Sequence, residues 1–439
     1  MEPLLIEPTD VLFFRDAIPM SAGQGKGAGA RMPFPSTLHE AFRASLLLSI
    51  GKQVNGKRIP GRPTGAARKG NWCSNGVTSD RFIASTDFRS LQCVGPFPWN
   101  KQKGLLLPVP LDAALEHDPQ KAKDSPPQAL RRMQLWRDNA VSPNTDEGTG
   151  AMRPLCLPLA VTPPDKQGQP HGWWRLDQFR SYLDGQKENP SDFFRPIPTT
   201  QLWEQEHRVG VQIDPETFAA THGQLYAGGY LRFCSSTRFA VQVHLAKPQA
   251  DEAKALQDLD WLLLGGEQRL ARLLHEGFDN PFVGIPPVPI PLVEGPCLLK
   301  WVLVTPAIFA HGSAPGWCVD SANHRSEARL PFGQVCFNNL PGRAHLISWC
   351  IGKILIVSGW DVVDQHAKPT QLAVPAGSVY YFLCENGDVA GQLAERLHWK
   401  PRSDFYGEKG CGYGLVSFDV QMHTMSPDVP TLANELLNG

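Results

Sequence analysis

Several features that would assign this sequence of 439 residues to a broad class of protein are missing from it. No apolar run approaches the roughly 18 residues that cross a bilayer, and the acidic N-terminus lacks the basic and apolar stretches of a signal peptide. The ten cysteines are dispersed without a C-x-x-C pair, and the spacing of Cys318, His324 and Cys336 fits no standard zinc site. We therefore expect a cytoplasmic protein with reduced thiols, no metal and no membrane contact.

The motifs of the common catalytic and nucleotide-binding sites are also missing. The sequence contains no G-x-x-x-x-G-K-[ST] loop and no G-x-S-x-G elbow. Residues 25–30 match the G-x-G-x-x-A dinucleotide pattern, but Pro33 and Pro35 prevent a helix from opening there. We expect no cofactor. Lys plus Arg number 42 and Asp plus Glu number 43, so no global basic field attracts nucleic acid, and any polyanion site must be local.

Glycine and proline, with 40 residues each, are the residues that the chain has in excess, so long uninterrupted helices are not expected. A strand is predicted over residues 4–14, and a glycine loop follows at 21–30. A helix is predicted to begin at Thr37, which would form a T-x-x-E capping box with Glu40, and to end at Gly51. Further helices are predicted at 128–138, 176–183, 253–275 (broken at Gly265 and Gly266) and 389–399, and further strands at 208–214, 223–227, 230–245, 297–304, 353–360, 378–383 and 415–420.

A proline-rich connection, residues 281–296, is expected to divide the chain into two domains. The first domain, 1–280, is expected to carry large insertions over about residues 51–200. The second domain, 297–439, contains a second glycine loop that ends at Gly414. Each half fits the β-α-β-β-α-β order of a ferredoxin-like (RRM-like) unit, so we predict an α+β protein of two such domains with glycine-rich loops.

The first glycine loop suggests a phosphate contact, because backbone N–H groups without obstructing side chains can cradle a phosphate, and Lys26 and Arg31 add charge.

His39 is the residue that we consider as a catalytic group. It shares a predicted helix with Arg43 at i, i+4, so both side chains project from one face. Beside an RNA phosphate, the histidine could act as general base for attack by the 2′-hydroxyl. A histidine that faces solvent or contacts RNA without chemistry is the favoured alternative.

Short segments, in order along the chain, resemble the RAMP-type subunit three of the Cmr complex, the type III-B CRISPR effector. Residues 51–200 resemble that family poorly. The matching segments are Leu12–Asp16, Pro35–Leu38, Ala41–Arg43, Arg208–Asp214, Gly223–Tyr226, Leu264–Arg269, Thr305–Pro306, Gly359–Trp360, Lys368–Pro369, Pro375–Tyr380 and the glycine loop that ends at Gly414.

The resemblance implies a non-catalytic subunit that binds and caps the 5′ handle of CRISPR RNA in antiviral defence. Such a subunit joins the large polymerase/cyclase-like subunit to the backbone RAMP subunit. Two glycine loops on one side of the molecule would hold several phosphates. The candidate RNA-binding residues are Arg15, Gly25, Lys26, Gly27, Arg31, His39, Arg43, Lys409, Gly410, Gly412 and Gly414.

Two alternatives stay open at this point. One is a metal-independent RAMP endoribonuclease that processes precursor CRISPR RNA with His39 as base, because the family usually has a small residue at this position. The other is a scaffold that binds the neighbouring subunits without contacting RNA itself.

Overall fold

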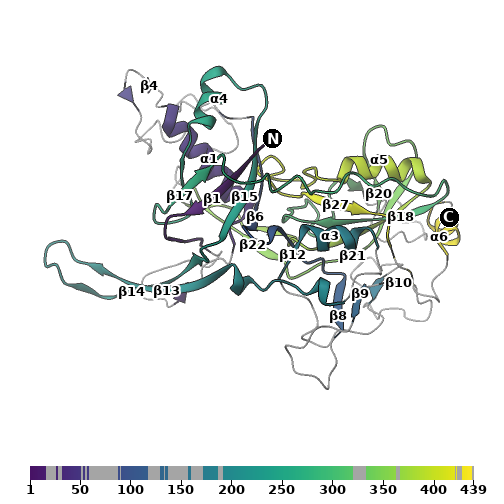
Figure 1. The fold of residues 1–439 in the computed structure, drawn as a ribbon, viewed down its shortest axis with the longest axis horizontal. Helices are drawn as coiled ribbons and strands as arrows, with labels where there is room; N and C mark the ends of the chain where they lie inside the picture. The colour runs from purple at the N-terminus through teal and green to yellow at the C-terminus, as the bar shows by residue number, and fades with distance from the viewer. Residues whose placement is uncertain are drawn as a thin grey trace.

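The structure is a computed structural model with a mixed α+β fold that is rich in strands (Figure 1). The α+β class that the sequence predicts is confirmed. The structure describes residues 1–15, 26–27, 32–50, 53–54, 57–58, 88, 90–116, 129–132, 134–136, 157–159, 172–185, 191–319, 333–361, 366–420, 422 and 428–437.

The N-terminal half is built on an antiparallel seven-stranded sheet in the order β12-β7-β6-β15-β1-β17-β16. Helices α1 (Pro35–Ile50) and α4 (Ala250–Gln257) pack together on one side of it. The seven strands are β1 (Glu2–Pro8), β6 (Leu91–Asn100), β7 (Gly104–Pro108), β12 (Trp173–Arg175), β15 (Thr237–Leu245), β16 (Trp261–Leu263) and β17 (Leu270–Leu274).

The C-terminal half is built on a six-stranded antiparallel sheet in the order β19-β20-β21-β26-β18-β27. Helix α5 (Gly387–Leu397) packs on this sheet, and the last described helix is α6 (Val429–Leu437). The strands are β18 (Cys297–Leu303), β19 (Cys318–Val319), β20 (Gln334–Val335), β21 (Ala344–Cys350), β26 (Val379–Cys384) and β27 (Gly414–Ser417).

The alternation of side chains along the strands explains how the two sheets share a core. Leu4 on β1 packs with α1, whereas the next residue, Leu5, belongs to a cluster that also holds Leu298 and Val302 of β18. Leu299 of β18 faces the other way, toward α5. Because successive strand residues point to opposite faces, each sheet is covered on one face by its helices and on the other by the shared core. All seven residues of β18 are buried for this reason.

A long hairpin of β13 (Trp203–Ile213) and β14 (Ala220–Phe233) projects from the body, and we call it the arm (Figure 1). Near the body, β14 pairs with the short strands β2 (Val11–Leu12) and β3 (Lys26–Gly27). The remaining short elements are β4 (Gln53–Val54), β5 (Lys57–Arg58), β8 (Ala113–Glu116), β9 (Ala129–Arg132), β10 (Gln134–Trp136), β11 (Leu157–Leu159), β22 (Leu355–Val357), β23 (Trp360–Asp361), β24 (His366–Ala367), β25 (Gln371–Ala373), α3 (Leu176–Leu183), η1 (Ser191–Phe194) and η2 (Thr199–Gln201).

Several predicted elements need correction. The predicted helix at 128–138 is replaced by β9 and β10. Only the first part of the predicted helix at 253–275 is present, as α4, which ends at Gln257. Strands β16 and β17 follow it, and the side chains of β17 alternate between exposed and buried, as in a strand with one face covered. Helix α1 begins at Pro35, so Thr37 lies inside its first turn and cannot form the predicted capping box. The predicted helix at 176–183 is confirmed as α3.

The proline-rich connection, residues 281–296, contains no helix or strand, and β18 begins immediately after it. The predicted domain limits themselves stay a prediction.

Strands β6, β7 and β12 lie within residues 51–200, so that region does more than insert loops into the N-terminal half. It supplies three strands of the seven-stranded sheet.

Candidate nucleic-acid interface

The base of the arm brings together the start of the chain and part of the first glycine loop. Lys26 and Gly27 pair in parallel with Ala227 and Gly228 of β14, and β2 pairs with the same strand closer to the body. Arg15 is exposed directly after the buried Phe13 and Phe14. The other candidates from this loop, Gly25 and Arg31, lie outside the described residues.

Two glycines allow a turn from the N-terminal half to lie against this segment. The N–H of Gly266 donates to the carbonyl of Phe13 at 2.8 Å. Gly265 has a φ of +88°, and a Cβ at this position would lie 2.4 Å from the Phe13 carbonyl oxygen. Only glycine fits both the backbone conformation and the space. The turn 265–269 is therefore fixed against the base of the arm.

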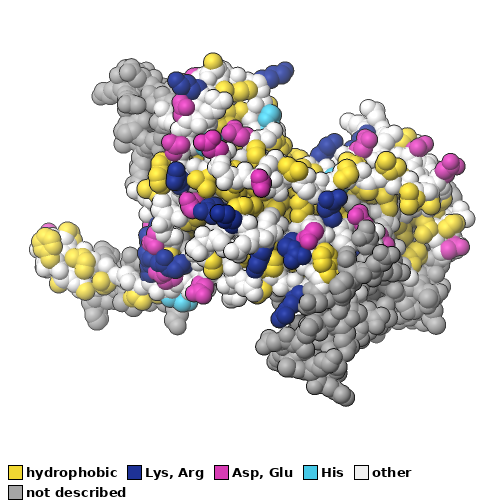
Figure 2. All heavy atoms as spheres, viewed as in Figure 1, with side chains coloured by type: hydrophobic (Ala, Val, Ile, Leu, Met, Phe, Trp, Pro, Cys, Tyr) yellow, Lys and Arg dark blue, Asp and Glu magenta, His cyan; other side chains and the backbone are white. Residues whose placement is uncertain are grey.

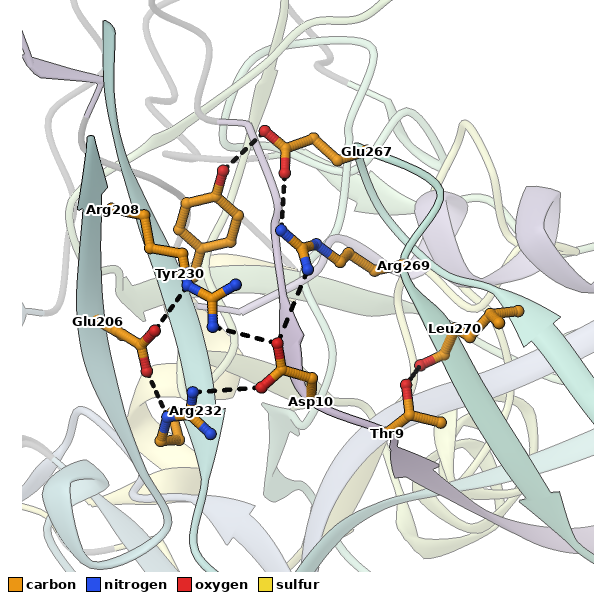
Figure 3. A network of polar contacts seen from close by, with 9 residues as sticks. All are labelled: Thr9, Asp10, Glu206, Arg208, Tyr230, Arg232, Glu267, Arg269 and Leu270. Carbon is orange, nitrogen blue, oxygen red and sulfur yellow. Dashed lines mark hydrogen bonds and ion pairs between the residues drawn. The ribbon is translucent and has the colours of Figure 1, made fainter. Parts of the chain in front are cut away.

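Three arginines meet one carboxylate at this point (Figure 3). Asp10 accepts hydrogen bonds from Nη2 of Arg208 on β13 at 3.1 Å and from Nη2 of Arg232 on β14 at 3.2 Å. Nη1 of Arg269 lies 3.7 Å from the same carboxylate. Glu206 bridges the two arm arginines through their Nε atoms, at 2.6 Å for Arg208. The network thus ties both strands of the arm to the body.

The ring of Tyr230 stands in the middle of the network. The guanidinium carbons of Arg208 and Arg269 lie 5.3 and 5.2 Å from its centroid, which is cation–π distance. Its hydroxyl donates to Oε1 of Glu267 at 2.7 Å, and Glu267 also pairs with Arg269 at 2.8 Å. Burial and this hydrogen bond raise the pKa of Tyr230 to about 12, so the hydroxyl stays a donor at neutral pH.

The carboxylates of the network remain ionised. Partial loss of hydration raises the pKa of Asp10, but the hydrogen bond from Arg208 and the charges of Arg208 and Arg232 outweigh it, and the pKa lies below its ordinary value. Hydrogen bonds from Arg232 and Arg208 likewise lower the pKa of Glu206. Figure 2 shows basic and acidic side chains gathered at the base of the arm, and apolar side chains along the arm beyond it.

The second group of predicted residues lies elsewhere, where α1 meets β6 and the second glycine loop. His39 is 5% exposed, and its Nε2 lies 3.1 Å from the carbonyl oxygen of Leu91 on β6. Lys409 is also buried and donates to Oε1 of Glu40 at 2.7 Å. Burial raises the pKa of Glu40, but His39 and Lys409 outweigh this effect and lower the pKa to about 2. Arg43 is half-buried on the same helix.

The glycines of the second loop are packed inside the protein, which differs from the expectation that their amides receive phosphates. A Cβ on Gly410 would lie 2.8 Å from the Cys93 carbonyl, and one on Gly414 would lie 2.2 Å from Nε1 of Trp301. The N–H of Gly410 donates to Gly407 at 3.1 Å, and that of Gly412 donates to Pro306 at 2.9 Å. Gly410 allows the loop to lie against β6 of the N-terminal half, and Gly412 and Gly414 allow close packing within the C-terminal half.

The two groups of predicted residues are therefore held at different parts of the fold, one at the arm and one at α1. The ion network is not among the sites that the sequence predicts. Arg208 and Arg269 stand in segments that carry the family resemblance. The period-2 placement of Glu206 and Arg208, which puts both on one face of a strand, is the only local signal.

Among the described residues, no group of three or more His, Cys, Asp or Glu side chains could hold a metal ion. No helix in the described ranges is long and apolar enough to span a membrane.

The family model of the CRISPR-associated protein (Cas_Cmr3) matches residues 4–418. The chain belongs to this family. The match confirms the resemblance to a Cmr subunit that the short segments indicate. The search of curated proteins found no match to the chain.

Among solved structures, the chain is similar to chains in two cryo-EM structures of the Type III-B Cmr-beta. One, bound to cognate target RNA, has 15% identity and a TM-score of 0.41; the other, bound to cognate target RNA and AMPPnP, has 16% identity and a TM-score of 0.39. Each alignment covers 87% of this chain and 86% of the other. A chain of the Csm3-Csm4 subcomplex of the type III-A interference complex has 11% identity and a TM-score of 0.31, with coverage of 87% and 92%.

Proposed function

We propose that this Cas_Cmr3 family member is a non-catalytic subunit of a type III-B CRISPR effector, and that it binds and caps the 5′ handle of CRISPR RNA. The observation that carries the proposal is the arm base, where the Lys26–Gly27 strand pairs with β14 and the ion network holds three guanidinium groups. Proteins recognise single-stranded RNA through phosphate contacts and stacking on aromatic and arginine planes, and the exposed Arg15 and the partly exposed guanidinium groups of Arg208 and Arg232 could make such contacts.

We infer that each half is a ferredoxin-like unit. In the N-terminal half, β17-β1-β15-β6 gives the spatial order 4-1-3-2, with α1 after the first strand and α4 after the third. In the C-terminal half, β27-β18-β26-β21 gives the same order, with α5 after the third strand. The repeated order supports two related units, which the shared core then joins.

The surroundings of His39 support a role without chemistry. A general base must reach the proton that it removes, and this imidazole is buried with Nε2 beside a backbone carbonyl and Nδ1 3.9 Å from Glu40. The alternative of a metal-independent endoribonuclease with His39 as base is not favoured by any contact of this side chain. We infer that His39 joins α1 to β6.

The arm supports the proposed contacts with the large polymerase/cyclase-like subunit and the backbone RAMP subunit. Phe218 at its tip is 82% exposed, and Val209 on β13 is 66% exposed. Apolar side chains this exposed on a projecting hairpin are typical of surfaces that are covered in a complex. We propose that the arm reaches one of these neighbouring subunits.

A binding experiment tests the proposal. The full chain is titrated into RNA that carries a 5′ handle and into RNA with a scrambled handle, with EDTA present and at several salt concentrations. We expect handle-selective binding without cleavage, and a salt slope of roughly −2 to −3 for three or four phosphate contacts. The Arg15→Ala/Lys26→Ala variant should bind more weakly, whereas the matched variant Arg272→Ala/Lys254→Ala, at two exposed positions, should bind like wild type.

Two outcomes would contradict the proposal. Equal affinity for the handle and the scrambled RNA would remove the capping role. Cleavage in EDTA that disappears in His39→Ala would replace it with the endoribonuclease alternative.

A further inference from the structure

A stack of three aromatic rings leads outward from the C-terminal sheet. Phe382 on β26 is buried, and Trp317 lies over it with a centroid distance of 5.9 Å and an interplanar angle of 20°. Phe337 continues the stack, 4.8 Å from Trp317 at an angle of 22°. Trp317 and Phe337 are partly exposed, so the stack carries an aromatic surface from the core to solvent.

Two arginines meet at the outer ring of this stack. The guanidinium carbons of Arg402 and Arg396 lie 5.2 and 5.6 Å from the centroid of Phe337. Arg396, in the last turn of α5, donates to the carbonyls of Asn338 and Asn339 at 2.6 and 3.1 Å. Arg402 donates through Nε to the carbonyl of Arg396. These bonds hold both guanidinium groups in fixed positions.

The second glycine loop helps to position Arg402. The N–H of Arg402 donates to the carbonyl of Gly412 at 3.0 Å, and its own carbonyl accepts from Nε1 of Trp317 at 3.0 Å. Gly412 also lies close to Ser403, the residue after Arg402. A Cβ on Gly412 would lie 2.1 Å from the backbone nitrogen of Ser403. The buried loop therefore supports the backbone that presents this arginine.

The charges of this pair are not balanced within the described part of the chain. Neither Arg396 nor Arg402 forms an ion pair with a described carboxylate, whereas each of the three arginines at the arm base does. Burial and the charge of Arg396 both lower the pKa of Arg402. Two like charges that share one aromatic ring are stabilised when an anion binds between them, and guanidinium groups match phosphate oxygens well.

We propose that Arg396 and Arg402, with Phe337 and Trp317, form a binding site for a phosphate of single-stranded RNA. The Nη1 and Nη2 groups of Arg402 would donate to the phosphate oxygens, and the ring edge of Phe337 would lie beside the neighbouring nucleotide. This inference rests on the proposed function, since it assigns an RNA contact to the C-terminal half. It adds a site that is separate from the arm base.

The test measures binding of a fluorescein-labelled handle RNA to the full chain by anisotropy over a salt series. We expect Arg402→Ala to weaken binding about tenfold, because charge-assisted hydrogen bonds to phosphate are among the strong ones. The salt slope should fall in magnitude by about 0.7, the contribution of one phosphate on a single strand. Arg402→Lys should keep the slope and recover part of the affinity. Arg272→Ala on β17 is the matched control and should change neither value.

A second measurement separates RNA contact from a structural effect at the end of α5. RNA that contains 4-thiouridine is photo-crosslinked to wild-type protein, and the crosslinked peptides are mapped by mass spectrometry. We expect a crosslink in the peptides that contain Trp317 or Phe337. Thermal unfolding of Arg402→Ala reports any loss of fold.

The outcomes distinguish this inference from the proposed function. If wild-type protein binds no RNA, both fail. If wild-type protein binds the handle but Arg402→Ala folds and keeps its affinity and salt slope, only this site is refuted. A variant with normal RNA binding and weaker binding to a neighbouring subunit would show that the pair contacts protein instead.

Discussion

The buried charge of Asp112 makes the sharpest stability prediction. Asp112 is 1% exposed and accepts hydrogen bonds from the hydroxyls of Tyr182 on α3 and Tyr381 on β26, the latter at 2.9 Å. Nζ of Lys300 on β18 lies 3.9 Å from Oδ2 of Asp112 and 4.0 Å from the centroid of the Tyr182 ring. One carboxylate thus connects α3 with two strands of the C-terminal sheet.

Asp112→Asn removes the charge, keeps one acceptor oxygen for the tyrosine hydroxyls and replaces the other oxygen with an amide donor. At 3.9 Å, the attraction to Lys300 is about 4 kcal/mol at an effective dielectric constant near 20. Removing one partner of a buried pair costs about 3–5 kcal/mol, because the other charge stays buried without compensation. We therefore expect Asp112→Asn to lower the free energy of unfolding by about 3–5 kcal/mol.

Urea unfolding followed by circular dichroism measures this change, with Asp279→Asn at an exposed position as the control. The double variant Asp112→Asn/Lys300→Met should recover most of the loss, because it removes both charges. A loss below about 1 kcal/mol in Asp112→Asn, or a double variant no more stable than the single one, would refute the assignment of a strong buried pair.

Three further predictions follow from other contacts. Burial lowers the pKa of Lys300 to about 8. Between about pH 8 and pH 10 the unfolded chain therefore binds more protons at Lys300 than the folded protein does, and the contribution of Lys300 to stability rises with pH. Urea midpoints at pH 7, 8 and 9 should rise less in Lys300→Met than in wild type. Gly412→Ala combines a φ of +78° with a Cβ 2.1 Å from backbone and should lower the free energy of unfolding by at least about 2 kcal/mol. Gly104→Ala, with a φ of +73° and open space, should lower it by only about 1 kcal/mol. Equal losses in the two variants would show that the loop at Gly412 relaxes. Asp10→Asn should change global stability by about 1 kcal/mol or less, since exposed pairs contribute little, but should speed amide exchange at β2; unchanged exchange there would show that strand pairing alone holds the arm.

The elements predicted well from sequence are those whose pattern is decided locally. The helix at 176–183 matches α3 because its apolar residues face one side within eight residues. The prediction of a helix over 253–275 is wrong beyond Gln257, because the apolar residues there fit a helix as well as two strands. The choice is made by pairing of β17 with β1, more than 260 residues away in sequence, and no local pattern contains that information.

The charged network at the arm shows the same limit for a site. Its members come from four separate stretches of chain, at Asp10, Glu206–Arg208, Tyr230–Arg232 and Glu267–Arg269. Each stretch is an ordinary polar surface by itself. The site exists only when β2, β13, β14 and the turn at 265–269 meet. Apart from the period-2 placement of Glu206 and Arg208, sequence indicates only Arg208 and Arg269, through the segments that carry the family resemblance, and not Arg232.

The two glycine loops show why a motif can be located without its role being known. Both were expected to offer free backbone amides to phosphate. At 407–414 the amides of Gly410 and Gly412 are already bonded inside the protein, and the missing side chains give space to Cys93, Ser403 and Trp301. Glycine is required there for close approach of the backbone. The charged group beside this loop is Arg402, whose backbone N–H donates to the carbonyl of Gly412. If Arg402 contacts phosphate as we propose, this glycine-rich loop serves RNA indirectly, by positioning that arginine.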